Sequence, residues 1–95
     1  MAFTTNPEAF ARHSALRFAE NTLAAYLQGQ ERDYAVHDVI RELRALFGDG
    51  ATTPAALLAR AMALDPDDAG RLKLVTEVLD MIGRQVRADG WVDAR

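Results

Sequence analysis

The residues of this chain that could carry out chemistry are few, and the first candidate is a pair. His37 follows Asp33 by four residues, so the two side chains share one face if the segment is helical. A carboxylate and an imidazole at this spacing can bind a metal ion or orient a general base. The same pair far more often forms a surface hydrogen bond. The other histidine, His13, is predicted on the polar side of a different helix, and no base stands at a spacing that would activate Ser14, the only serine.

A second candidate is the acidic cluster Asp65, Asp67 and Asp68. It lacks the glycine and the terminal glutamate of an EF-hand loop, so helix capping explains these residues better than cation binding. The Glu-x-x-His pattern of di-iron bundles, the His-Glu-x-x-His pattern and the glycine-rich nucleotide loops are all absent. The chain also has no cysteine, which excludes thiolate metal sites. We therefore predict a protein that is not an enzyme and that uses no metal or cofactor.

Composition narrows the class of protein further. The 95 residues are enough for one domain, residues 1–95, and a content of 49% hydrophobic and 26% charged residues is that of a folded globular protein. A formal net charge of −3 provides no basic surface for nucleic acid or anionic membrane. No apolar run reaches the length of a membrane span, and the N-terminus lacks a signal pattern, so we expect a cytoplasmic protein. Ten of the eleven basic residues are arginine, a usage typical of GC-rich bacterial or phage genomes.

Apolar periodicity and capping residues predict an all-α, compact four-helix bundle in a single domain. The predicted helices cover residues 7–28, 33–47, 54–64 and 66–89. For the last helix we expect Asp65 as N-cap, Pro66 in the first position, and Gly90 as the C-terminal stop. In the first helix His13 is expected to face solvent, whereas the residues expected on the core-facing arc are Ala11, Ala15, Leu16, Phe18, Ala19, Leu23, Tyr26 and Leu27.

The helix at 66–89 carries two adjacent apolar rows. One contains Leu72, Val75, Leu79, Ile82 and Val86, and the other contains Leu74, Val78 and Met81. Either this helix is central and touches two or three helices of its own chain, or the second row faces another chain. Small domains bury proportionally little surface, so both interpretations stay open. The second interpretation predicts a protein-interaction module that forms a homodimer or docks on another protein as adaptor, regulator or inhibitor. The residues predicted at the interface are Leu74, Val78, Met81 and Trp91.

The segment VIRELRALFGDGATTPAALLARAMALDPDDAGRL, residues 39–72, resembles the helix-turn-helix of winged-helix transcriptional regulators, and ADGWV resembles the passage from recognition helix to wing. The resemblance covers roughly the second half of the chain. It implies a helix-turn-helix-like arrangement there and a DNA-binding function, with Arg71 and Lys73 as the contacts. The acidic residues Asp67 and Asp68 would face phosphates of like charge, and the predicted helix is longer than a recognition helix usually is. Protein contact is therefore the preferred function and DNA binding the alternative.

Overall fold

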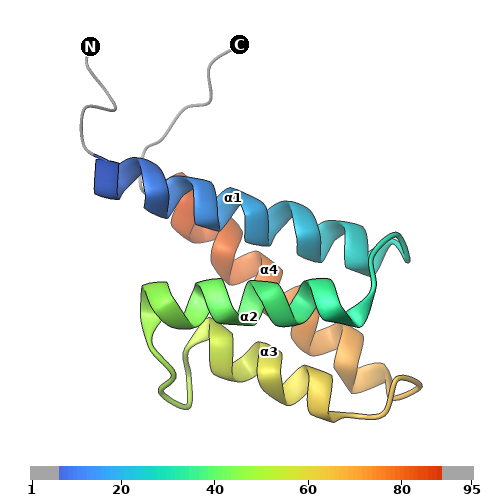
Figure 1. Cartoon of the computed structure of the whole chain (residues 1–95). Coiled ribbons are helices and arrows are strands. Elements are labelled where there is room, and N and C mark those ends of the chain that lie inside the picture. Colours follow the sequence, from blue (N-terminus) through green and yellow to red (C-terminus); the bar gives the residue numbers. More distant parts are fainter. Residues whose placement is uncertain (1–6, 89–95) are drawn as a thin grey trace.

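The computed structural model describes residues 7–88, and these residues form four α-helices (Figure 1). The helices are α1 (Pro7–Leu27), α2 (Asp33–Phe47), α3 (Pro54–Ala63) and α4 (Ala69–Ala88). The predicted all-α fold is confirmed, and no strand occurs among the described residues. Successive helices run in opposite directions. The α1–α2 and α3–α4 turns therefore lie at one end of the bundle, and the α2–α3 loop lies at the other (Figure 1).

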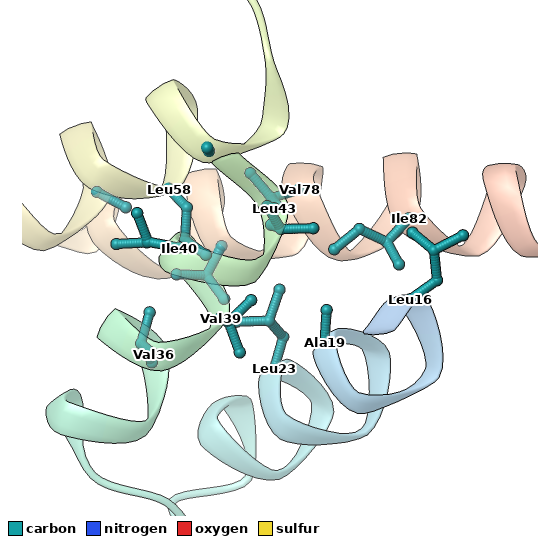
Figure 2. Packing of buried hydrophobic residues seen from close by; sticks show 13 residues of the cluster. Leu16, Ala19, Leu23, Val36, Val39, Ile40, Leu43, Leu58, Val78 and Ile82 are labelled. Atoms are coloured by element: carbon teal, nitrogen blue, oxygen red, sulfur yellow. The ribbon is translucent and has the colours of Figure 1, made fainter. Parts of the chain in front are cut away.

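Each helix packs against two others around a shared core. Helices α1 and α3 each contact both α2 and α4, whereas within residues 7–88 α1 does not pack against α3, nor α2 against α4. One apolar cluster fills the space between all four helices (Figure 2). Its fully buried large side chains are Leu16, Leu23, Val36, Val39, Leu43, Leu58, Val75, Val78 and Ile82.

Local sequence signals determine where the first three helices end and begin. Gly29 and Gly48 follow α1 and α2 with φ of 77° and 81°, a left-handed conformation that side chains disfavour. The N–H of Gly48 donates to the Arg44 carbonyl at 2.8 Å, which satisfies one carbonyl at the end of α2. The Thr53 hydroxyl accepts from the Ala56 N–H at 3.4 Å, and Pro54 occupies the first turn of α3.

The predicted start of the last helix is wrong by three residues. The side chain of Asp68, rather than that of Asp65, accepts from the free N–H of Gly70 at 2.7 Å. The Asp65 carbonyl instead closes a turn by accepting from the Asp68 N–H at 2.9 Å. Because both aspartates precede a possible first turn, the sequence contains two competing caps, and the second one is used. Pro66 therefore lies in the connecting turn, and the expected stop at Gly90 lies outside the described residues.

The predicted orientation of α1 about its own axis is also wrong in part. His13 is buried, with 7% of its surface exposed, whereas Phe18 is 43% exposed. Ala11, also expected in the core, is exposed. The residues that enter the core are Leu16, Ala19 and Leu23. Small and apolar residues occur on every side of α1, so the sequence pattern does not identify the side that faces the core.

Candidate interaction surfaces

Both apolar rows of α4 are used largely within the chain itself. Val78 has no exposed surface and belongs to the apolar core cluster (Figure 2). Leu74, from the same row, is half-buried and packs against the core, as do Leu79 and Val86 from the other row. Because α4 packs against both α1 and α3, each row has a neighbour. The predicted contact of Val78 with a second chain is thereby corrected, since this side chain is enclosed by its own domain.

Met81 is the predicted interface residue that lines an open hollow. The hollow has a volume of about 220 Å³, and Phe47 and Pro54 contribute its other apolar walls. The Arg12 guanidinium lies 5.3 Å from the centre of the Phe47 ring, and its Nη2 donates to Gln85 Oε1 at 3.0 Å. Trp91, the remaining predicted residue, lies outside the described part of the chain. Of the three predicted residues that the structure describes, Val78 is buried and Leu74 and Met81 are half-buried, so these three do not form one exposed surface.

Arg71 connects all four helices at the end of the bundle that holds the two short turns. Only 5% of its surface is exposed. Its Nη1 donates to the Tyr26 hydroxyl of α1 and to Asp33 Oδ2 of α2, both at 3.1 Å. Its Nη2 donates to the carbonyls of Met62, at 3.2 Å, and Leu64, at 2.7 Å, which satisfies the C-terminus of α3. We call these residues the Arg71 cluster.

The electrostatics of this cluster favour its charged form. The hydrogen bond from Arg71 is the largest influence on the Asp33 carboxyl and holds its pKa below the usual value. Desolvation opposes this effect, and the weaker effect of the hydrogen bond from Tyr26 lowers the pKa further. The hydrogen bond to Tyr26 is the largest cause that raises the pKa of Arg71, followed by the bond to Asp33. Arg71 is thus a positioning group inside the fold, and its predicted role as a DNA contact is wrong. Lys73 is exposed, as expected.

The Arg71 cluster could have been suspected from the sequence. The fully buried apolar residues of α4 are Val75, Val78 and Ile82, which come from both predicted rows. Arg71 precedes them in steps of four, three and four, so it lies on the same buried side of the helix. An arginine at such a position must find acceptors inside the protein, because an unpaired buried charge is strongly unfavourable. The partners themselves come from three other helices and have no sequence signal.

A groove between α2 and α3 contains His37. It encloses about 460 Å³, and its α2 wall carries His37, Arg41 and Arg44. Both carboxylate oxygens of Asp33 accept hydrogen bonds, one from Arg71 and one from Tyr26. Asp33 is therefore already engaged and does not form a dedicated pair with His37 for catalysis or metal binding. Within residues 7–88 no three histidine or acidic side chains are grouped closely enough to hold a metal ion, and this includes Asp65, Asp67 and Asp68.

The outward side of α1 differs from those of the other long helices. Between Phe10 and Leu27 its exposed residues carry no charge. Arg17 and Glu20 are half-buried at its flank and are paired with each other at 3.3 Å. By contrast, the outward side of α4 carries the charged residues Lys73, Glu77, Asp80, Arg84 and Arg87, although Leu72 near its start is also exposed. We call the exposed residues Phe10, Ala11, Ser14, Phe18 and Asn21 the α1 outer face.

Comparison with known proteins adds no family to this description. No protein-family model, curated protein or solved structure matches the chain. In the part of the chain that the structure describes, no helix has the length and apolar character needed to cross a bilayer.

Proposed function

We propose that this chain is a non-enzymatic protein-interaction module, an adaptor, regulator or inhibitor, that self-associates through the α1 outer face. The observation that supports the proposal is the absence of charge from this face, in which Phe18 is 43% exposed. A helix at a protein surface normally carries charged residues on its outward side, and a helix without them is normally covered. The helix face that contacts the partner is then on α1 instead of α4.

A second copy of the chain is the partner that best fits this face. Two copies with a formal charge of −3 each repel one another, and an uncharged face is where they approach at the least electrostatic cost. A two-fold axis across α1 would bring the same residues together from both copies. Ala11 and Ser14 are small enough to let two helices approach closely beside the Phe18 rings.

The dimensions of the face predict a weak dimer. The 21 residues of α1 span about 31 Å, and one helix face buries less than the roughly 800 Å² per partner of a standard interface. We therefore expect a dimer that forms at micromolar or higher concentration and dissociates on dilution. An obligate dimer would need a wider apolar surface.

Light scattering over a wide concentration range tests this proposal. The unmodified chain should change from monomer mass to dimer mass as its concentration rises. Phe18→Glu should remain monomeric because it introduces two like charges across the axis. Tyr34→Glu is the matched control, since Tyr34 is another exposed aromatic residue, on α2, with 67% of its surface exposed. The proposal fails if the unmodified chain stays monomeric throughout, or if the two variants weaken association equally while both retain their helical circular dichroism.

A further inference from the structure

The groove between α2 and α3 combines a basic wall with an apolar floor. His37, Arg41 and Arg44 follow one another by four and three residues, so they form one row along α2. The floor and the opposite wall consist of Ile40 from α2 and Met62 from α3, with Ala59 and Ala63 beside them. Met62 has a flexible side chain that can adapt to the shape of a partner.

Most charges on α2 are divided between two sides. Asp38 and Glu42 lie on the flank away from α3, and the basic row lies on the flank toward α3. Asp33 stands one turn before His37 on the basic side, where it is paired with Arg71. Arg41 is 3.3 Å from Asp38, but both side chains are largely exposed, so this pair is weak and can exchange partners. Arg44 has no carboxylate partner among residues 7–88. An acidic protein thus has a local basic row beside an apolar depression.

From this arrangement we propose that the groove binds an acidic amphipathic segment of another protein, with carboxylates on the basic row and an apolar side chain over Met62. A helix with glutamates four and three residues apart reproduces the rise between His37, Arg41 and Arg44, which is about 6 Å and then about 4.5 Å. Such a partner satisfies both walls at once. This proposal concerns a different surface from the α1 outer face and does not depend on self-association.

Phosphate and nucleic acid fit the groove less well. Residues 37–44 lie in the interior of α2, where backbone N–H groups are already used in the helix, so the groove lacks the free N–H groups of a phosphate site. Three basic side chains next to an acidic flank also offer little for a polyanionic backbone. Neither ligand would use the apolar floor.

Fluorescence anisotropy with designed peptides tests the proposal on the full chain. The probe is a labelled helical peptide with glutamates at i, i+4 and i+7 and leucines on the adjoining face. The control peptide has glutamine in place of each glutamate. We expect the glutamate peptide to bind at low salt and the glutamine peptide to bind at least about tenfold more weakly. Because the whole protein is negatively charged, an acidic peptide binds only if a local basic site attracts it.

Charge reversal in the groove provides the second part of the test. The double variant R41E/R44E should weaken binding of the glutamate peptide by at least about tenfold. R60E should leave binding unchanged, because Arg60 is an exposed arginine of α3 outside the groove. Phe18→Glu should also bind the peptide normally, so failure of this proposal and failure of self-association give different results.

Three results would overturn the proposal. The first is no binding of the glutamate peptide at low salt, and the second is equal binding of the two peptides. The third is displacement of the peptide by inorganic phosphate or by a single-stranded oligonucleotide that binds the protein more tightly than the peptide does.

Discussion

Helices α1 and α4 are the two longest helices and pack against each other, yet they differ in which sides they leave open. Helix α4 has two apolar rows, and its own chain covers most of both. Its outward side carries a mixture of charges that includes Lys73, Glu77 and Asp80. Helix α1 has a less distinct core row, and its outer face is exposed without any charge. The helix with the more distinct apolar rows is therefore the one whose rows are largely covered by its own chain.

This difference shows what an apolar pattern measures. The two apolar rows on α4 are explained by its two neighbours within the bundle, α1 and α3. They do not show whether another chain is present. A better sign of a surface that binds another chain is an outward helix side without charged residues. A helix side that faces solvent normally carries charged residues. The predictions that follow test this distinction.

The largest expected difference is between two substitutions to glutamate, one on each helix. Val78→Glu places a carboxylate in the core without a partner, and we expect it to lower the free energy of unfolding by more than about 4 kcal/mol. Phe18→Glu replaces a side chain that is already 43% exposed and should change that free energy by less than about 1 kcal/mol. Urea unfolding followed by circular dichroism measures both. Similar losses for the two variants would remove the distinction between the helices.

Removal of the buried guanidinium should have the next largest effect. Arg71→Ala leaves the Met62 and Leu64 carbonyls without their donor, and we expect a loss of about 2–4 kcal/mol. Arg71→Lys should lose less, because an ammonium can still bond to some of these acceptors. Arg84→Ala is the matched control, since Arg84 and Asp80 form an exposed pair and such pairs contribute about 0–1 kcal/mol. If Arg71→Ala costs no more than this control, the Arg71 cluster does not hold the helices together.

Truncations within the second row of α4 sharpen the comparison on that helix. Val78→Ala should cost about 2 kcal/mol because it leaves a cavity in a closed core. Met81→Ala should cost about 1 kcal/mol or less, since Met81 already borders an open hollow. Differential scanning calorimetry of the two variants provides the ranking. The reverse order would mean that Met81 is more enclosed than its position indicates.

Acid should have the smallest effect. The pKa of Asp33 is lowered below its ordinary value of 3.8 in the folded state, mainly by the hydrogen bond from Arg71. The stability that this carboxylate contributes is therefore fully present above pH 3.8 and is lost as the pH falls through the folded pKa. Because the Asp33 side chain is 54% exposed, the change should be small. Urea midpoints measured below pH 5 should fall less for Asp33→Asn than for the unmodified chain, and parallel curves would contradict the assignment.

Most of the fold could be predicted because the helix signals are local. Pro7, Gly29, Gly48 and Thr53-Pro54 mark helix ends through backbone geometry and capping, which depend on a few adjacent residues. The start of α4 was missed because Asp65 and Asp68 are both competent caps, and the choice depends on how the α3–α4 turn packs. The orientation of α1 was missed because its pattern has little contrast between sides.

The candidate surfaces could be predicted less well because they depend on distant contacts. Val78 and Met81 belong to the same row, but only tertiary packing determines that the first is enclosed and the second borders a hollow. The partners of Arg71 are as far as 45 residues away in sequence, so its role follows from the arrangement of helices. The groove at His37 likewise requires α3 to lie beside α2.

Site-specific cross-linking tests the central claim, self-association through α1, most directly. The chain has no cysteine, so Ser14→Cys places a single thiol in the middle of the α1 outer face, and Thr76→Cys places one on the exposed side of α4 as a control. With a short bifunctional maleimide at concentrations where the dimer forms, we predict efficient covalent dimers from Ser14→Cys and few from Thr76→Cys. Equal yields from the two positions, or dimers from Thr76→Cys alone, would contradict association through α1.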